Sequence, residues 1–173
     1  MTTAFGKEPL SVRGRWIVII VATVVLQFSY WLAVVSVWAD PGEELVTAGM
    51  LLGLAAVPFV FMLLAFASRH PRAPWAVVRA MALFVIVGIP LGILHIASGV
   101  AAGYAAGGIA ALRGPEGVRH AAARIAMVVA VSFSITIILA VAPGPGLVLG
   151  ALLPFPALGL ADWVAARHHN GVA

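Results

Sequence analysis

Charged residues divide the chain into four long apolar runs that contain no Asp, Glu, Lys or Arg. Each run exceeds the about 20 residues that an α-helix needs to cross about 30 Å of hydrocarbon. The runs do not alternate apolar and polar residues as a half-buried strand does, so the predicted fold class is all-α. The four runs span residues 16–39, 45–68, 80–112 and 125–161.

The run 80–112 is too long for one crossing. With the residues that precede it from Pro74, it would form a helix of roughly 60 Å at about 1.5 Å per residue, which even a tilted helix cannot fit into a bilayer. We therefore expect a hairpin within 80–112, with its turn near Ser98 and Gly99. A hairpin also places every basic residue on one side of the membrane, whereas a single crossing would leave several on the other side.

The last run is interrupted at residues 143–146, Pro-Gly-Pro-Gly, which predicts a second hairpin within 125–163. The predicted architecture is a polytopic integral membrane helical bundle of four to six transmembrane helices, with six favoured. Lys7, Arg13 and Arg15 place the N-terminus in the cytoplasm. The expected organisation is a cytoplasmic tail (1–15), a single transmembrane domain (16–167) and a cytoplasmic C-terminal tail (168–173).

Composition agrees with a membrane protein and not with a soluble domain. Hydrophobic residues make up 63% of the chain and charged residues 9%, against about 25% charged in ordinary soluble domains. The net charge of +4 comes from basic residues placed singly or in pairs at the ends of apolar runs. Positive-inside placement explains them better than nucleic-acid binding does. Arginine exceeds lysine, and alanine, valine and glycine are abundant, which is typical of a bacterial protein, so we expect the bacterial cytoplasmic (inner) membrane.

Small residues recur at helical spacing in two of the runs. Glycine lets another helix backbone approach closely, and such contacts drive helix association in lipid. We therefore interpret these positions as helix-packing faces, which also predict a membrane protein partner or a homo-oligomer. The other expected partner is membrane lipid. The candidate packing residues are Gly49, Gly53, Gly88, Gly92, Gly99, Gly103 and Gly107.

His95 is the histidine that lies farthest from any charge, on the same helical arc as four of these glycines. An ionisable side chain at membrane depth is a candidate functional group. Its alternative role is a neutral imidazole that binds a neighbouring helix. Gln27 and Tyr30 share one face of the first predicted helix and are candidate ligand or proton contacts together with His95, although a hydrogen bond between helices would also explain the glutamine.

The sequence lacks the patterns of catalytic, cofactor and metal sites. All six acidic residues lie in predicted loops or helix ends, and the chain has no cysteine. His168 and His169 lie in a predicted tail, where adjacent histidines lack a fixed third ligand, so we expect no metal and no cofactor. We expect a non-enzymatic accessory or assembly subunit of a larger membrane complex. The alternatives are a small transporter or solute-binding component that uses His95 and Gln27 in the bundle interior, and a membrane-embedded lipid enzyme.

Overall fold

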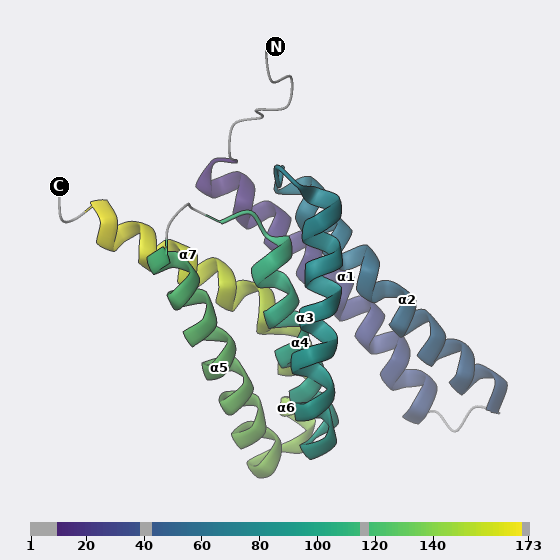
Figure 1. Cartoon of the computed structure of the whole chain (residues 1–173). Helices are drawn as coiled ribbons and strands as arrows, with labels where there is room; N and C mark the ends of the chain where they lie inside the picture. The colour runs from purple at the N-terminus through teal and green to yellow at the C-terminus, as the bar shows by residue number, and fades with distance from the viewer. Residues whose placement is uncertain (1–9, 39–42, 115–117, 171–173) are drawn as a thin grey trace.

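The computed structural model describes residues 10–38, 43–114 and 118–170, and within these ranges it contains seven helices and no strand. The predicted all-α class is confirmed. Figure 1 shows the helices packed side by side, with neighbours in sequence mostly antiparallel. The helices are α1 (Val12–Trp38), α2 (Glu43–Ala67), α3 (Ala73–Leu94), α4 (Ile96–Ala111), α5 (Val118–Val141), α6 (Pro143–Leu152) and α7 (Pro154–Asn170).

Helices α3 and α4 form an antiparallel hairpin. A Cβ atom built on Gly99 would lie 2.5 Å from the carbonyl oxygen of Gly88, and one built on Gly103 would lie 3.0 Å from that of Phe84. Gly107 approaches Ala80 in the same way, at 2.9 Å. The partner number falls by four each time the glycine number rises by four, so the two helices run in opposite directions and approach closely along their glycines.

The turn of this hairpin lies at His95 and not near Ser98 and Gly99, where we expected it. His95 has an extended backbone (φ −159°, ψ 117°) between the last residue of α3 and the first of α4. Its N–H donates to Leu91 O, and its carbonyl accepts from Gly99 N–H, both at 2.9 Å. One extended residue therefore reverses the chain while the helical hydrogen bonds continue on both sides, and Gly99 is free to pack against α3.

The second expected hairpin differs in detail from the prediction. Residues 143–146 do not form a non-helical turn, because α5 ends at Val141 and Pro143 opens α6. Proline is favoured in the first turn of a helix, where its missing N–H would have no partner, so these prolines start a helix instead of breaking one. The expected second arm is also divided, since α6 ends at Leu152 and α7 begins at Pro154.

Helix α4 lies at the centre of the molecule. Nearly all of its Ala and Gly residues are buried, whereas the buried residues of α3 are limited to its first two turns, at Ala73, Ala76 and Ala80. Tyr104 of α4 packs against the rings of Phe61, Phe84 and Phe155, with centroids 5.0 to 6.0 Å apart. This aromatic cluster joins α2, α3, α4 and α7 into one core.

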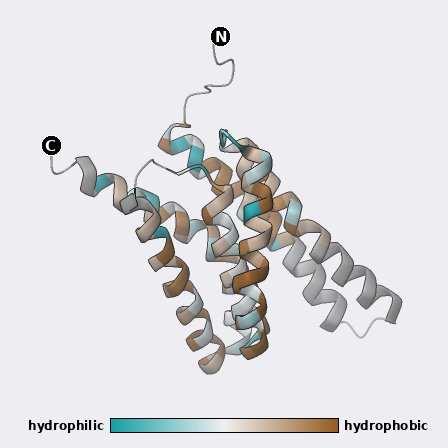
Figure 2. Cartoon of the chain, in the orientation of Figure 1, coloured by the Kyte–Doolittle hydropathy of each residue, from teal (hydrophilic) through white to brown (hydrophobic). Residues whose placement is uncertain are grey.

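Two of the described helices are long and apolar enough to cross a membrane, namely Ala73–Leu94 and Ala121–Val141, with hydropathies of 2.4 and 2.3. Large hydrophobic side chains are exposed along both of them. Figure 2 colours much of both helices brown, for hydrophobic residues. Ala55–Ala67 and Ile96–Ala111 are apolar but shorter. The structure thus supports two of the expected spans by length and composition, and it does not establish a bundle of four to six.

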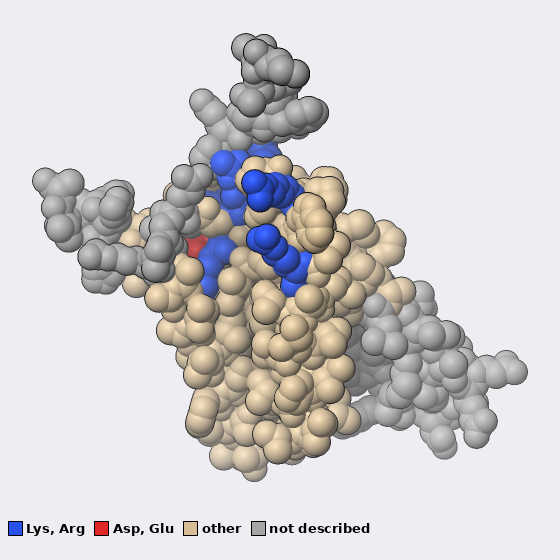
Figure 3. Space-filling model, viewed as in Figure 1, with Lys and Arg blue, Asp and Glu red and all other residues tan. Residues whose placement is uncertain are grey.

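On the face shown in Figure 3, the basic side chains gather near one end, and the tan surface below them carries none among the described residues. This end brings together the start of α1, the α2–α3 turn, the C-terminal end of α4, the start of α5 and the later part of α7. The arginines whose side chains the structure describes are Arg13, Arg15, Arg69, Arg72, Arg79, Arg113, Arg124 and Arg167. We call this region the basic end.

Candidate functional site

The structure does not bring the three predicted polar contact residues together. His95 is exposed at the tip of the α3–α4 hairpin, so the expectation that it lies in the bundle interior is wrong. The physical reason is that the chain reverses at this residue, which ends the helix that would have carried the imidazole inward. Gln27 of α1 lies in a separate cleft beside α6, and the side chain of Tyr30 lies outside the described residues.

The cleft beside α1 is lined by Thr23, Val24, Gln27, Phe28 and Leu152 and has a volume of about 390 Å³. Gln27 Oε1 is buried there and accepts no hydrogen bond from the described residues. Thr23 does not supply one, because its hydroxyl donates to Ile19 O at 2.8 Å. The amide oxygen is therefore a hydrogen-bond acceptor without a donor in the described part of the chain.

Four of the seven candidate packing glycines face the chain itself. Gly88, Gly99, Gly103 and Gly107 lie between α3 and its neighbours, and the Phe61 ring covers Gly107. A Cβ on Gly92 would meet nothing within 4 Å. The surroundings of Gly49 and Gly53 lie outside the described residues. The glycines of the α3–α4 hairpin thus pack within the protein, and their closest faces are not open to a partner.

An open groove with a volume of about 690 Å³ lies between the α3–α4 hairpin and α5. We call it the α3–α5 groove. Its size falls within the range of about 300–1,000 Å³ that is usual for small-molecule sites. Its walls are leucine, isoleucine, valine and phenylalanine side chains with three hydroxyl residues. The lining residues are Leu83, Val87, Leu91, Leu94, Ser98, Ala106, Ile109, Ile125, Val128, Val129, Ser132, Phe133 and Thr136.

The three hydroxyl groups of the groove have partners within the protein. The Thr136 and Ser98 hydroxyls are hydrogen-bonded to each other at 3.0 Å, which ties α5 to α4. Thr136 Oγ1 also lies 2.8 Å from Ser132 O, and Ser132 donates to Val128 O at 2.8 Å. Because the protein already binds these hydroxyls, the groove presents an essentially apolar surface.

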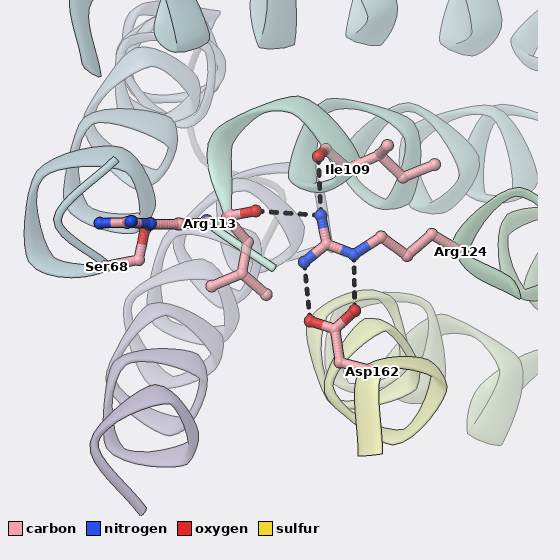
Figure 4. A network of polar contacts seen from close by, with 6 residues as sticks. Ser68, Ile109, Arg113, Arg124 and Asp162 are labelled. Atoms are coloured by element: carbon pink, nitrogen blue, oxygen red, sulfur yellow. Dashed lines mark hydrogen bonds and ion pairs between the residues drawn. The ribbon is translucent and has the colours of Figure 1, made fainter. Parts of the chain in front are cut away.

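A buried ion pair, shown in Figure 4, lies next to two lining residues of this groove, Ile109 and Ile125. Arg124 Nε and Nη2 each donate to one carboxylate oxygen of Asp162 at 2.7 Å, and both side chains are 7% exposed. Arg124 Nη1 donates to the carbonyl oxygens of Ile109 and Leu112 at 3.0 Å. A cation at the C-terminus of a helix is favourable because the last carbonyls lack helical partners. Arg124 thus joins α4, α5 and α7.

Sequence reasoning missed this ion pair, because it interpreted the basic residues at the ends of the apolar runs as positive-inside charges and placed all acidic residues in loops or helix ends. A signal was present in the predicted second hairpin. Arg124 lies at the start of its first arm and Asp162 near the end of its second, so an antiparallel hairpin brings opposite charges to the same end. Gly114 belongs to the same site, since a Cβ atom on it would collide with the Arg124 guanidinium.

A second arginine ties the end of α4 to the α2–α3 turn. Arg113 N–H donates to Ser68 Oγ, and Arg113 Nη1 donates to Arg69 O, each at 3.0 Å. Arg69 has a positive φ of 56° and is the left-handed residue of a Schellman motif at the end of α2. In this motif, His70 N–H donates to Ala65 O. Helix α4 is therefore anchored at its C-terminus by two arginines.

His70, in the α2–α3 turn, lies among these arginines. Burial, and next the charge of Arg113, lower the pKa of the imidazole below its ordinary value of 6.5. Its Nδ1 accepts a hydrogen bond from Arg72 N–H at 3.2 Å, which requires that nitrogen to be unprotonated. The neutral ring is the form that fits this turn.

Known proteins provide no assignment for these features. No family model, curated protein or solved structure matches the chain. Within the described ranges, no group of three or more histidine or acidic side chains could hold a metal ion. The α3–α5 groove, flanked by the Arg124–Asp162 pair, is therefore the candidate site that the structure itself defines.

Proposed function

We propose that the chain is a six-pass, non-enzymatic membrane protein that binds an apolar ligand in the α3–α5 groove. In this arrangement α1 to α5 each cross once, and α6 with α7 supplies the sixth pass. The outward-facing hydrophobic side chains of α3 and α5 support the membrane location. The basic end faces the cytoplasm under the positive-inside rule, and a bacterial inner membrane remains the expected location.

The open groove is the observation that carries this function. Its walls come from three helices, its polar groups are satisfied, and its opening faces outward between α3 and α5. A polar solute would find few hydrogen-bonding groups along these walls, because the hydroxyls are already engaged within the protein, whereas an apolar molecule would bury surface against the walls. The ligand-binding function that we propose is therefore independent of His95.

The accessory-subunit function is a second proposal, and Gln27 favours it. Its buried amide oxygen has no donor among the described residues, and it lies in a cleft on the outer part of α1. A helix of a partner protein with a serine or amide donor would satisfy it, as interhelical hydrogen bonds do in membranes. The α3–α4 glycines no longer support this function, because they pack within the chain.

Val129 provides a test of the groove, because it lines the opening and is 53% exposed. Replacing Val129 by tryptophan should fill the groove without disturbing the core. The full-length protein would be extracted in a mild detergent, and native mass spectrometry would record the molecules that remain bound. We expect an apolar small molecule on the wild type and at least a fivefold lower occupancy on Val129→Trp.

Val85→Trp is the matched control, since Val85 is 45% exposed on α3 and does not line the groove. It should bind like the wild type. Equal occupancy in Val129→Trp and wild type would overturn the groove function. A stoichiometric protein partner in place of a small molecule would favour the accessory-subunit function instead.

The six-pass topology predicts which ends of the chain are accessible from outside the cell. Because the sequence has no cysteine, single cysteines can be introduced and labelled with an impermeant maleimide. On intact cells, His95→Cys at the hairpin tip should react. Val172→Cys, after the last pass, should react only in permeabilised cells. Labelling of Val172→Cys from outside would contradict an even number of passes.

A further inference from the structure

We infer that the occupant of the α3–α5 groove is an acyl chain of a membrane lipid with an anionic headgroup, and that Arg79 binds this headgroup. The inference rests on the proposed ligand-binding function and adds the chemical class of the ligand. It is carried by three features of the groove: its direction and length, its satisfied hydroxyls, and the arginine at its basic end.

The groove runs along the helices and begins near the basic end. On α3 it extends from Leu83 to Leu94, and on α5 from Ile125 to Thr136. Each wall is therefore about 16 Å long at about 1.5 Å per residue. Both helices begin at the basic end, so an occupant would lie parallel to them with one end beside the arginines. This is the direction of a lipid chain in a bilayer.

The walls of the groove suit an acyl chain. The hydroxyls of Ser98, Ser132 and Thr136 are already hydrogen-bonded within the protein, so a slim chain without hydrogen-bonding groups can lie against them without leaving a polar group unpaired.

Arg79 supplies the charge at the basic end of the groove. It lies four residues before Leu83 and so falls on the same face of α3, one turn nearer the basic end. Its side chain is exposed and makes no hydrogen bond or ion pair with the described residues. By contrast, Asp162 neutralises Arg124, and Arg113 binds the α2–α3 turn. A long arginine side chain reaches the headgroup level readily, where it favours an anion.

The test compares two lipids with the same chains and different headgroups, dioleoyl phosphatidylglycerol and dioleoyl phosphatidylcholine. Each is titrated into the full-length protein in mild detergent, and native mass spectrometry gives the apparent Kd. We expect the wild type to prefer the anionic lipid by about fivefold, the effect of one interfacial arginine. Arg79→Ala should reduce this preference to about one without changing the Kd of the choline lipid, and Arg79→Lys should retain it.

Arg13→Ala is the charge-matched control, because Arg13 is also exposed at the basic end but belongs to α1. It should keep the preference. If Arg79→Ala keeps the preference for the anionic lipid, or if the wild type has no such preference, the anionic class of the ligand is wrong. The groove function would still stand in that case, provided that Val129→Trp weakens the binding of both lipids. If Val129→Trp weakens neither lipid, the groove function itself fails. If a partner protein is bound to the wild type and is lost in Val129→Trp, the occupant of the groove is that protein and not a lipid.

Discussion

Replacement of Arg124 by alanine is expected to destabilise the folded chain by about 3–5 kcal/mol, the usual result of removing one partner of a buried ion pair. The buried Asp162 carboxylate would lose its two charge-assisted hydrogen bonds. The carbonyls of Ile109 and Leu112 would lose their donor as well. The free energy of unfolding can be measured by circular dichroism while the protein is titrated with a denaturing detergent.

Two comparisons separate the ion pair from a general effect of charge. Asp162→Asn should also be strongly destabilising, because it leaves the guanidinium charge buried. The double variant Arg124→Leu with Asp162→Leu should recover much of the loss, since apolar residues of similar volume often replace buried ion pairs at little cost. Arg13→Ala removes an exposed arginine and should change the stability by less than about 0.5 kcal/mol. A similarly small change in Arg124→Ala would contradict the buried pair.

The ion pair also connects stability to the candidate site. Arg124 precedes Ile125, which lines the groove, and it holds the carbonyl of Ile109, which lines the groove from α4. It therefore fixes the distance between two walls of the groove at the basic end. A loss of Arg124 should widen the groove before the helices separate, so weaker lipid binding in Arg124→Leu with Asp162→Leu would report this positioning role.

Sequence reasoning predicted the fold class from features that act locally. Long apolar runs without alternation favour helices, and the excess length of the run 80–112 demands a reversal. The turn position was wrong because it was sought among small residues, whereas one extended residue, His95, reverses the chain. The prolines at 143 and 145 were misread for a related reason: a proline ends a helix from within but begins one at its first turn.

The candidate site could not be predicted to the same extent, because it depends on which helix faces come together. Arg124 and Asp162 are 38 positions apart and appear in the sequence as ordinary terminal charges. The hydroxyls of Ser98 and Thr136 meet only when α5 packs on α4. Conversely, His95 is conspicuous in the sequence because it lies far from charges, and the structure exposes it. Isolation along the chain therefore indicates little about burial.

Gly99→Ala is expected to destabilise the chain by about 1–3 kcal/mol, whereas Gly92→Ala should be neutral or stabilising by up to about 1 kcal/mol. The added methyl group at Gly99 would collide with the backbone of Gly92 and lie 2.5 Å from Gly88 O, and backbone atoms cannot move aside as a flexible side chain would. The methyl group at Gly92 would meet nothing within 4 Å, so the higher helix propensity of alanine should dominate there.

These two variants make the same change at two glycines of the α3–α4 hairpin, one with a closely packed Cβ position and one with an open Cβ position. They therefore separate close packing from helix propensity. Unfolding in a denaturing detergent gives both stabilities under one condition. Gly103→Leu should exceed the effect of Gly99→Ala, because it would push Phe84 out of the aromatic cluster around Tyr104. Equal stabilities of Gly99→Ala and Gly92→Ala would contradict the close packing of α3 against α4. The glycines would then be available to contact a partner helix.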